Sequence, residues 1–230
     1  DLSGNRAIRI SSPAVWYHRT FSISEGQKEG RILLHFGAVD HSCSVWWNGH
    51  LLGKHENGYL SFSFDVTDYL QEGNNTLWVR VQDDSDSGSQ SRGKQSLKPH
   101  GMFYTAQSGI WQTVWMEWVP EKRIEKLKIT PLYDEGSVRL EITLTQPQDM
   151  EIRMLWNRDS YCHYVEKEDF PADQNTFVRD IRLPDFRPWS PEDPSFMRYS
   201  LSRKPTPSTA ILPCGNFPWD WMKNNSQSFS

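Results

Sequence analysis

The sequence of 230 residues is poor in cysteine, with only Cys43, Cys162 and Cys214. Their number is odd, their spacings are wide, and neither a CxxC pair nor a Cys/His cluster at zinc spacing occurs, which argues against a disulfide framework or a structural zinc. The seven histidines are scattered, and a lone one such as His35 or His163 is expected to pack or face solvent. We therefore expect the chain to need no metal and no organic cofactor.

Long hydrophobic runs are also absent, and no stretch approaches the roughly 20 residues that a membrane-spanning helix needs. The opening residues, DLSGNRAIRI, lack the basic start, apolar stretch and cleavage site of a secretory signal, so we expect a cytoplasmic protein. Acidic and basic residues are interspersed around a net charge of -4, which leaves no basic stripe to follow a nucleic-acid backbone. Neither a membrane nor nucleic acid is an expected partner.

Short runs of alternating apolar residues, separated by turn residues, fill the first half of the chain. Period-two alternation, which is typical of strands, occurs in WYHRTFSI (16–23), RILLHFGAV (31–39), SVWWNG (44–49) and TLWVRVQ (76–82). Asn48 and Gly49 suit a tight hairpin turn with positive φ, and Asp65 is placed to cap a helical turn in DVTDYLQEG. The pattern predicts an antiparallel sandwich or barrel.

A second series of strands follows Pro120. It consists of IEKLKITPLY, SVRLEITLTQ, MEIRMLWNRD and TFVRDIRLPDF, and its spacing fits an immunoglobulin-like sandwich. We place the domain boundary near residue 121, which gives a first domain over 1–121 and a second over 122–194. The stretch 195–230 has neither strand alternation nor helical period and is predicted as a polar tail.

The stretch from Val15 to Pro120 resembles the N-terminal sugar-binding domain of family 2 glycoside hydrolases, the family of β-galactosidases and β-glucuronidases. The resemblance is carried by VWYHRTF, LLHFGAVDHSCSVWWNGHLLGKHENGYLSFSFDVTDYLQEGNNTLWVRVQD, RGKQ and SGIWQTVWMEWVP. It implies an all-β fold, with a jelly-roll, galactose-binding-like β-sandwich followed by an immunoglobulin-like one that ends in a proline-rich bend, which RPWSPEDP matches. It also implies that the first strands of the jelly roll are missing here and that the second sandwich is incomplete.

A polar loop of roughly twenty residues interrupts the strand pattern after Asp83, and a loop of that length in a compact domain is typically functional or disordered. In the resembling family this region reaches toward the mouth of the catalytic barrel. Cationic and amide side chains there could bond sugar hydroxyls or a carboxylate, and aromatic ones could take a sugar's C–H face. The alternative is a surface that only docks against another domain. The candidate substrate-binding residues are Arg92, Lys94, Gln95, Tyr104 and Trp111.

Catalytic residues are not expected in this chain. Retaining glycoside hydrolysis uses two carboxylates about 5 to 5.5 Å apart, and in the resembling family both are glutamates of a barrel that follows the second domain and takes roughly 250 residues. Glu141, Glu151 and Glu192 lie on predicted strands or a loop and are interpreted as solvated surface charges. The expected partners are a β-glycoside, with a β-galactoside ahead of a β-glucuronide, and the absent catalytic barrel.

Three interpretations of function stay open. The chain is the accessory region of a family 2 glycosidase, a free-standing carbohydrate-binding or adaptor module, or an inactive gene remnant that folds poorly. The third is favoured by the apparent cut at both ends of the chain. A separate hypothesis is that residues 195–230 are frameshifted, because the codons of 213–223 permit the string MRKLSLGLDE one nucleotide out of register, and family members carry such a strand at the end of the second domain. The nucleotide sequence decides whether these residues are a frameshift product.

Overall fold

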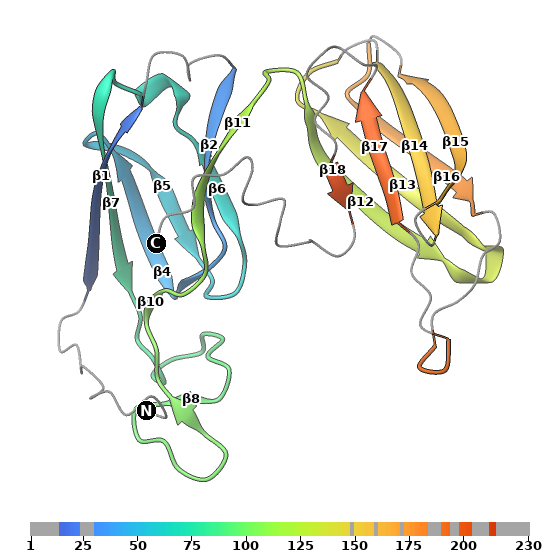
Figure 1. Cartoon of the computed structure of the whole chain (residues 1–230). Coiled ribbons are helices and arrows are strands. Elements are labelled where there is room, and N and C mark those ends of the chain that lie inside the picture. The colour runs from blue at the N-terminus through green and yellow to red at the C-terminus, as the bar shows by residue number, and fades with distance from the viewer. Residues whose placement is uncertain are drawn as a thin grey trace. The chain divides into compact units, whose positions relative to one another are not determined.

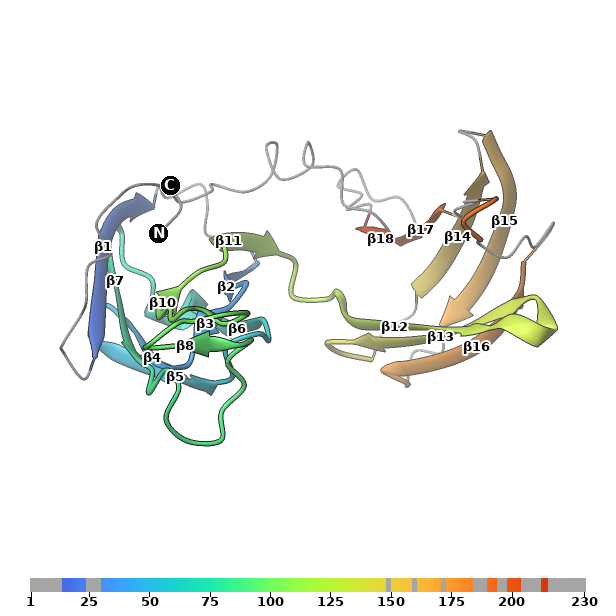
Figure 2. The ribbon, with the colours of Figure 1, turned by 90° about the horizontal axis from the view of Figure 1, so that it is seen from below.

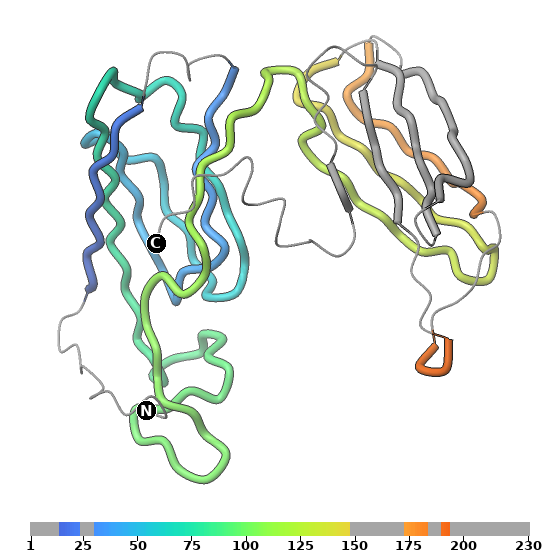
Figure 3. Tube along the Cα trace, viewed as in Figure 1, coloured from blue at the N-terminus to red at the C-terminus, as the bar shows by residue number. Residues whose placement is uncertain are grey.

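The computed structural model describes residues 14–23, 30–147, 150–158, 161–170, 173–183, 190–193, 198–203 and 212–214, and Figure 3 traces the chain. Strands dominate these residues, and the described helical elements are two short 3-10 turns, η2 (Thr67–Tyr69) and η3 (Tyr133–Glu135). The all-β prediction is therefore confirmed. None of the described helices is long and apolar enough to cross a membrane. Contacts divide the chain into two compact units that meet between Pro120 and Glu121.

The first unit is a sandwich of two main antiparallel sheets, drawn in blue to green in Figures 1 and 2. One sheet has the order β1-β7-β4-β5 and the other the order β11-β2-β6, while β10-β3 and β8-β9 form two small ribbons. The strands are β1 (Val15–Ile23), β2 (Arg31–Phe36), β3 (Val39–Asp40), β4 (Ser42–Trp47), β5 (His50–Glu56), β6 (Phe62–Asp65), β7 (Gly73–Gln82), β8 (Gln95–Ser96), β9 (Tyr104–Thr105), β10 (Gly109–Ile110) and β11 (Val114–Val119).

Strict alternation of buried and exposed residues builds the core between these sheets. Every second residue of β2 and β4 is buried, so each strand turns one face inward, as its period of two requires. Trp47 and Phe36 are the largest fully buried side chains, and Phe21 packs edge-on against the Trp47 ring. The core of the first unit consists of Ile23, Ile32, Leu34, Phe36, Val39, Cys43, Val45, Trp47, Val66, Leu77, Val79, Val81 and Met116.

The predicted turns are confirmed. Asn48 and Gly49 join β4 to β5 with φ of 48° and 83°, the left-handed conformation that a two-residue hairpin needs. Asp65 accepts hydrogen bonds from the backbone N–H of Thr67 at 3.0 Å and from its hydroxyl at 2.6 Å, and so holds the first residue of η2. The helical segment covers only three residues, because the chain turns back into β7 at Gly73.

A buried asparagine ties the hairpin to the turn that precedes β7. The Asn75 amide donates to the carbonyls of Gln71 and Gly73 at 2.8 and 3.1 Å. Its carbonyl oxygen accepts from the backbone N–H of Gln71 at 2.9 Å and from the Asn48 amide at 2.8 Å. All polar atoms of the fully buried Asn75 side chain are therefore satisfied, which fixes the ends of three strands.

The second unit contains two further antiparallel sheets, of order β12-β13-β16 and β15-β14-β17-β18. Its described core lies on the first of these sheets and consists of Val138, Leu140, Ile142, Leu144, Phe177, Ile181 and Leu183. The strands are β12 (Ile124–Leu132), β13 (Ser137–Leu144), β14 (Met150–Arg158), β15 (Tyr161–Phe170), β16 (Thr176–Arg182), β17 (Arg198–Arg203) and β18 (Leu212–Cys214).

Two of these strands fall in the stretch predicted as a tail, 195–230. Strand β17 pairs with β14 over Ile152 to Asn157, and β18 pairs with β17. The other residues of that stretch lie outside the described residues, and so does most of what the frameshift hypothesis covers. Residues 1–13 also lie outside the described residues.

Candidate functional site

The polar loop covers residues 83–108 of the first unit, between the end of β7 and the start of β10. Figure 1 shows it as the green segment that projects beyond the ends of the strands. Inside it β8 and β9 pair in parallel, and the backbone N–H of Tyr104 donates to the carbonyl of Lys94 at 3.0 Å. Two of the five candidate residues, Lys94 and Tyr104, are thus neighbours although they are ten positions apart.

Asp83 fixes the base of the loop. One of its carboxylate oxygens accepts from the backbone N–H of Ser85 at 2.8 Å and from the Gln90 amide at 2.6 Å. The other accepts from the Ser108 hydroxyl at 2.5 Å, so the carboxylate joins the start of the loop to its end. Each bond to a charged acceptor is stronger than a bond between neutral groups, which holds the base closed.

Asp86 organises the tip in the same way. Its carboxylate accepts from the backbone N–H of Leu97 at 2.8 Å and from the Ser96 hydroxyl at 3.1 Å. The Leu97 N–H is the main reason that the pKa of Asp86 lies below its ordinary value. Arg92 donates from Nη1 to the backbone carbonyl of Asp86, so one side of its guanidinium is engaged within the loop.

Gln95 connects the loop to the sandwich. Its amide donates to the Asp40 carboxylate at 3.3 Å, and its carbonyl oxygen accepts from the backbone N–H of Gln107. Asp40 is buried, and burial raises the pKa of this carboxyl above its usual value. Gly58 packs against it so closely that a Cβ there would lie 2.5 Å from the Asp40 Oδ1 atom. Both ends of the Gln95 side chain therefore have partners within the protein.

Trp111 stands at the edge of the loop with its indole fixed. Its Nε1 donates to the carbonyl of Gly58 at 2.8 Å, and its ring meets Tyr59 edge-on at 6.0 Å between centroids. A Cβ on Gly93 would lie 2.5 Å from the Tyr59 hydroxyl, so Tyr59 touches the loop as well as Trp111. Tyr59 therefore contacts both Trp111 and the turn at Gly93, and so places them next to each other.

Three of the five candidate residues are exposed, and Arg92 and Gln95 are half-buried. Tyr104 is 65% exposed and Trp111 48% exposed, and Lys94 is also exposed. Lys94 has φ of 64°, a left-handed conformation that lets the chain turn under β9. Sequence reasoning missed the residues that hold this arrangement, which are Asp40, Tyr59, Asp83 and Asp86. Aspartates beside Ser, Gly and Gln are a signal of side-chain-to-backbone turns that could have found the last two.

The glutamates singled out in the sequence form no metal-binding group among the described residues. No group of three or more His, Cys, Asp or Glu side chains among them could hold a metal ion. Glu141 pairs with the Lys128 ammonium at 2.5 Å on the surface of the second unit, and Glu192 is exposed. The side chain of Glu151 lies outside the described residues.

Two β-sandwich units, with an anchored polar and aromatic loop on the first, define the class of this protein. Residues 4–120 match the family model described as glycosyl hydrolases family 2, sugar binding domain. The chain therefore belongs to glycosyl hydrolase family 2, which confirms the resemblance seen in the sequence.

Relatives with curated names are enzymes much longer than this chain. A β-galactosidase of Thermoanaerobacter pseudethanolicus is 25% identical over 209 residues, which are 86% of this chain and 26% of that protein. A β-glucuronidase of Formosa agariphila is 29% identical over 122 residues, 52% of this chain and 12% of its own length. The crystal structure of Bacteroides uniformis β-glucuronidase matches with a TM-score of 0.64 at 24% identity, over 84% of this chain and 24% of that one. The chain thus spans about a quarter of the β-galactosidase.

Proposed function

We propose that this chain is the accessory carbohydrate-binding and scaffold region of a family 2 β-glycosidase, and that the loop contributes contacts to the sugar. The observation that carries the proposal is the half-exposed Trp111 indole, whose orientation is fixed by the 2.8 Å bond to Gly58. A fixed aromatic ring loses little conformational entropy when a ligand stacks on it, which favours binding.

Each candidate residue has a distinct part in the proposed site. Trp111 and Tyr104 provide flat faces for the C–H side of a pyranose ring. Lys94 supplies three donors, and Arg92 supplies the guanidinium N–H groups that its bond to Asp86 leaves free, for hydroxyls or a sugar carboxylate. Gln95 positions the loop through Asp40 and Gln107, since both ends of its amide are occupied.

The substrate class is a β-glycoside, with a β-galactoside ahead of a β-glucuronide. The chemistry belongs to a catalytic barrel outside this chain, which provides the two carboxylates that hydrolysis requires. This chain alone is therefore expected to bind a sugar weakly and to leave a β-glycosidic bond intact. A cytoplasmic location stays a prediction from the sequence.

Titration of the isotope-labelled chain with methyl β-galactoside and methyl β-glucuronide, followed by NMR, tests the proposed contacts. Tyr104→Ala and Trp111→Ala should each weaken binding of both sugars by about tenfold, because each removes an aromatic contact near the centre of the site. Lys94→Ala should weaken glucuronide binding more than galactoside binding, since only the glucuronide carries a carboxylate. Lys98→Ala, an exposed lysine of the same loop, is the matched control and should change neither.

Equal affinities of all variants for both sugars would overturn the proposed contacts and leave the loop as a docking surface for another domain. The gene-remnant interpretation predicts a chain that lacks a cooperative thermal transition. A reading frame that continues past the codons of 213–223 into a barrel would place the chain within a longer gene, whereas its absence favours a free-standing module.

A further inference from the structure

The outer face of the β1-β7-β4-β5 sheet changes along the strands from a mainly aromatic row of side chains to a polar row. Strand register defines these rows, because residues directly opposite each other in paired strands project on the same side of a sheet. The aromatic row is His18, Trp78, Trp46 and Leu51, the middle row is Trp16, Arg80, Ser44 and Lys54, and the polar row is Gln82, Ser42 and Glu56. We call these eleven residues the Trp16 face.

The indole rings on this face lie outside the core and contact one another. Trp16 stacks on Trp46 with centroids 5.5 Å apart and meets Trp78 edge-on at 6.3 Å. The His18 ring stacks on Trp78 at 4.1 Å, which holds that indole in place. Trp16 is nevertheless 54% exposed and Trp78 40% exposed. Large flat rings are thus fixed in orientation and still open to solvent.

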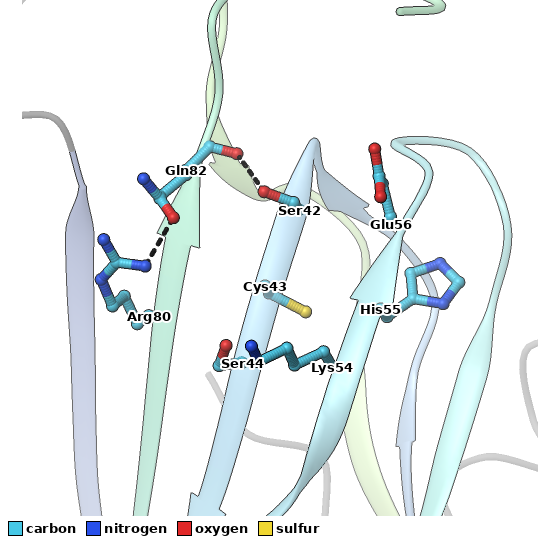
Figure 4. A pocket seen from close by; sticks show the side chains of 8 residues that line it. All are labelled: Ser42, Cys43, Ser44, Lys54, His55, Glu56, Arg80 and Gln82. Carbon is cyan, nitrogen blue, oxygen red and sulfur yellow. Dashed lines mark hydrogen bonds between the residues drawn. The ribbon is translucent and has the colours of Figure 1, made fainter.

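A polar cavity of about 340 Å³ lies next to Trp16, because Arg80 lines the cavity and its guanidinium lies over the Trp16 ring at 6.0 Å from the centroid. Figure 4 shows the side chains around it, which come from three neighbouring strands, β7, β4 and β5. Arg80 donates to the Gln82 side chain at 2.5 Å and the Ser42 hydroxyl donates to the Gln82 carbonyl at 3.2 Å, so these groups are oriented before a ligand arrives. A cavity of this volume lies within the range of about 300 to 1,000 Å³ that is usual for small-ligand pockets.

Charged groups of the cavity are available to a ligand. Within the part of the chain that the structure describes, Lys54 and Glu56 have no side-chain partner, although both line the cavity. Lys54 and Arg80 stand on either side of Ser44 in the middle row, so two cations flank a hydroxyl. This set of donors and acceptors suits a ligand with many hydroxyls and tolerates one that carries a carboxylate.

The fold does not require these aromatic rings, because the opposite face of the same strands already fills the core with residues such as Val45 and Val79. Solvent-exposed tryptophans gathered on one face indicate a binding surface rather than a packing element. We propose that the Trp16 face is a carbohydrate-binding platform, separate from the loop, that takes a glycan of two or more rings. One pyranose ring stacks on Trp16 with Trp78 beside it, and the next enters the polar cavity.

A glycan fits this face better than an apolar protein surface does. The rings cover only one part of the face, and charged and hydroxyl side chains from three strands fill the rest, so a flat apolar partner would bury Lys54 and Glu56 without counterparts. A pyranose ring presents an apolar C–H side to an indole and its hydroxyls to the groups beside it, which matches the order of the rows. The Trp16 face shares no residue with the loop site, so failure of the proposed loop contacts would not decide whether the Trp16 face binds a glycan.

Calorimetric titration of the full 230-residue chain with β-1,4-galactotetraose and with β-1,4-tetramannuronate, a neutral and a carboxylate-bearing probe, tests the platform. Trp16→Ala and Trp78→Ala should each weaken binding of whichever probe binds the parent chain by about tenfold or more, as loss of a central aromatic contact does at other interfaces. Arg80→Ala should weaken binding of tetramannuronate more than that of galactotetraose. Trp16→Phe keeps a ring and should retain most of the affinity.

Tyr133→Ala, which removes an exposed aromatic side chain of the second unit, is the matched control and should leave tetrasaccharide binding unchanged. Thermal unfolding of every variant establishes that it is folded, and the high exposure of Trp16 makes a large loss of stability unexpected for its variants. Absence of binding to both probes, or binding that Trp16→Ala and Trp78→Ala leave unchanged, would overturn the platform. Loss of binding only on Tyr104→Ala would assign tetrasaccharides to the loop and would also overturn it.

Discussion

Replacement of Gln95 by alanine should release the loop from the sandwich. The substitution removes the amide that donates to the buried Asp40 carboxylate and the carbonyl that accepts from the Gln107 backbone N–H. Asp40 would then keep a buried carboxylate whose Oδ1 already lacks a hydrogen-bond partner within the described residues. Because burial disfavours an unpaired charge, the loop should open to admit water to Asp40.

The size of the effect follows from the two bonds. A hydrogen bond to a charged group contributes about 1.5 to 3 kcal/mol, and its 3.3 Å length places the bond to Asp40 near the lower bound. The bond to Gln107 contributes about 1 kcal/mol more. Loop opening should therefore become easier by about 2.5 kcal/mol, or roughly 70-fold in its equilibrium constant.

Amide hydrogen exchange measures this at the backbone N–H of Tyr104, whose acceptor in the loop, the Lys94 carbonyl, is left in place by the substitution. In Gln95→Ala its exchange should accelerate by roughly 70-fold, whereas amides of the core strand β2 should exchange as in the parent chain. Gln107→Ala is the matched control, because it truncates an exposed glutamine of the same region without touching either bond. Exchange at Tyr104 that Gln95→Ala leaves within about twofold of the parent would refute the anchoring scheme.

Other substitutions and reagents test the sandwich itself. Asn75→Ala removes four buried hydrogen bonds and should lower the free energy of unfolding by about 3 kcal/mol in urea denaturation, while exposed Asn74→Ala should cost under about 1 kcal/mol. Although burial raises it, hydrogen bonds led by those from Thr67 lower the pKa of Asp65, so its ionised form stabilises the fold above the unfolded pKa of about 3.9. That contribution is lost as the pH falls through the lower folded value, so the stability difference between the parent and Asp65→Asn should shrink as the pH falls below about 4, the unfolded pKa. Burial raises the pKa of the Cys43 thiol to about 11, so iodoacetamide at pH 8, as read by mass spectrometry, should modify Cys43 only in the unfolded chain.

Much of the first unit follows from local sequence chemistry. Strand alternation predicted the buried rows of β2, β4 and β7, and Asn48, Gly49 and Asp65 were placed correctly because each acts on its immediate neighbours. The helical turn is shorter than predicted, since the buried bonds of Asn75 draw the chain into β7 by Gly73.

The arrangement of the loop could not be read from the sequence, because its anchors are distant in the chain. Asp40 and Gln95 are 55 positions apart, and Trp111 reaches Gly58 across 53 positions. A sequence pattern predicts which residue types occur in a polar loop, but the pairing of its side chains depends on the sheet edges that meet beneath it. Gln95 therefore looked like a ligand contact in the sequence and has its partners inside the protein in the structure.

The position of a bound sugar tests the central claim most directly. A β-galactoside that carries a nitroxide label broadens NMR signals of nearby protons, and the 230-residue chain should show that broadening at the amides of 92–95, at Tyr104 and at the Trp111 indole. Broadening confined to these residues is the predicted result. Broadening confined to the second unit, or none at any residue of the loop, would contradict the proposal that this loop contacts the sugar.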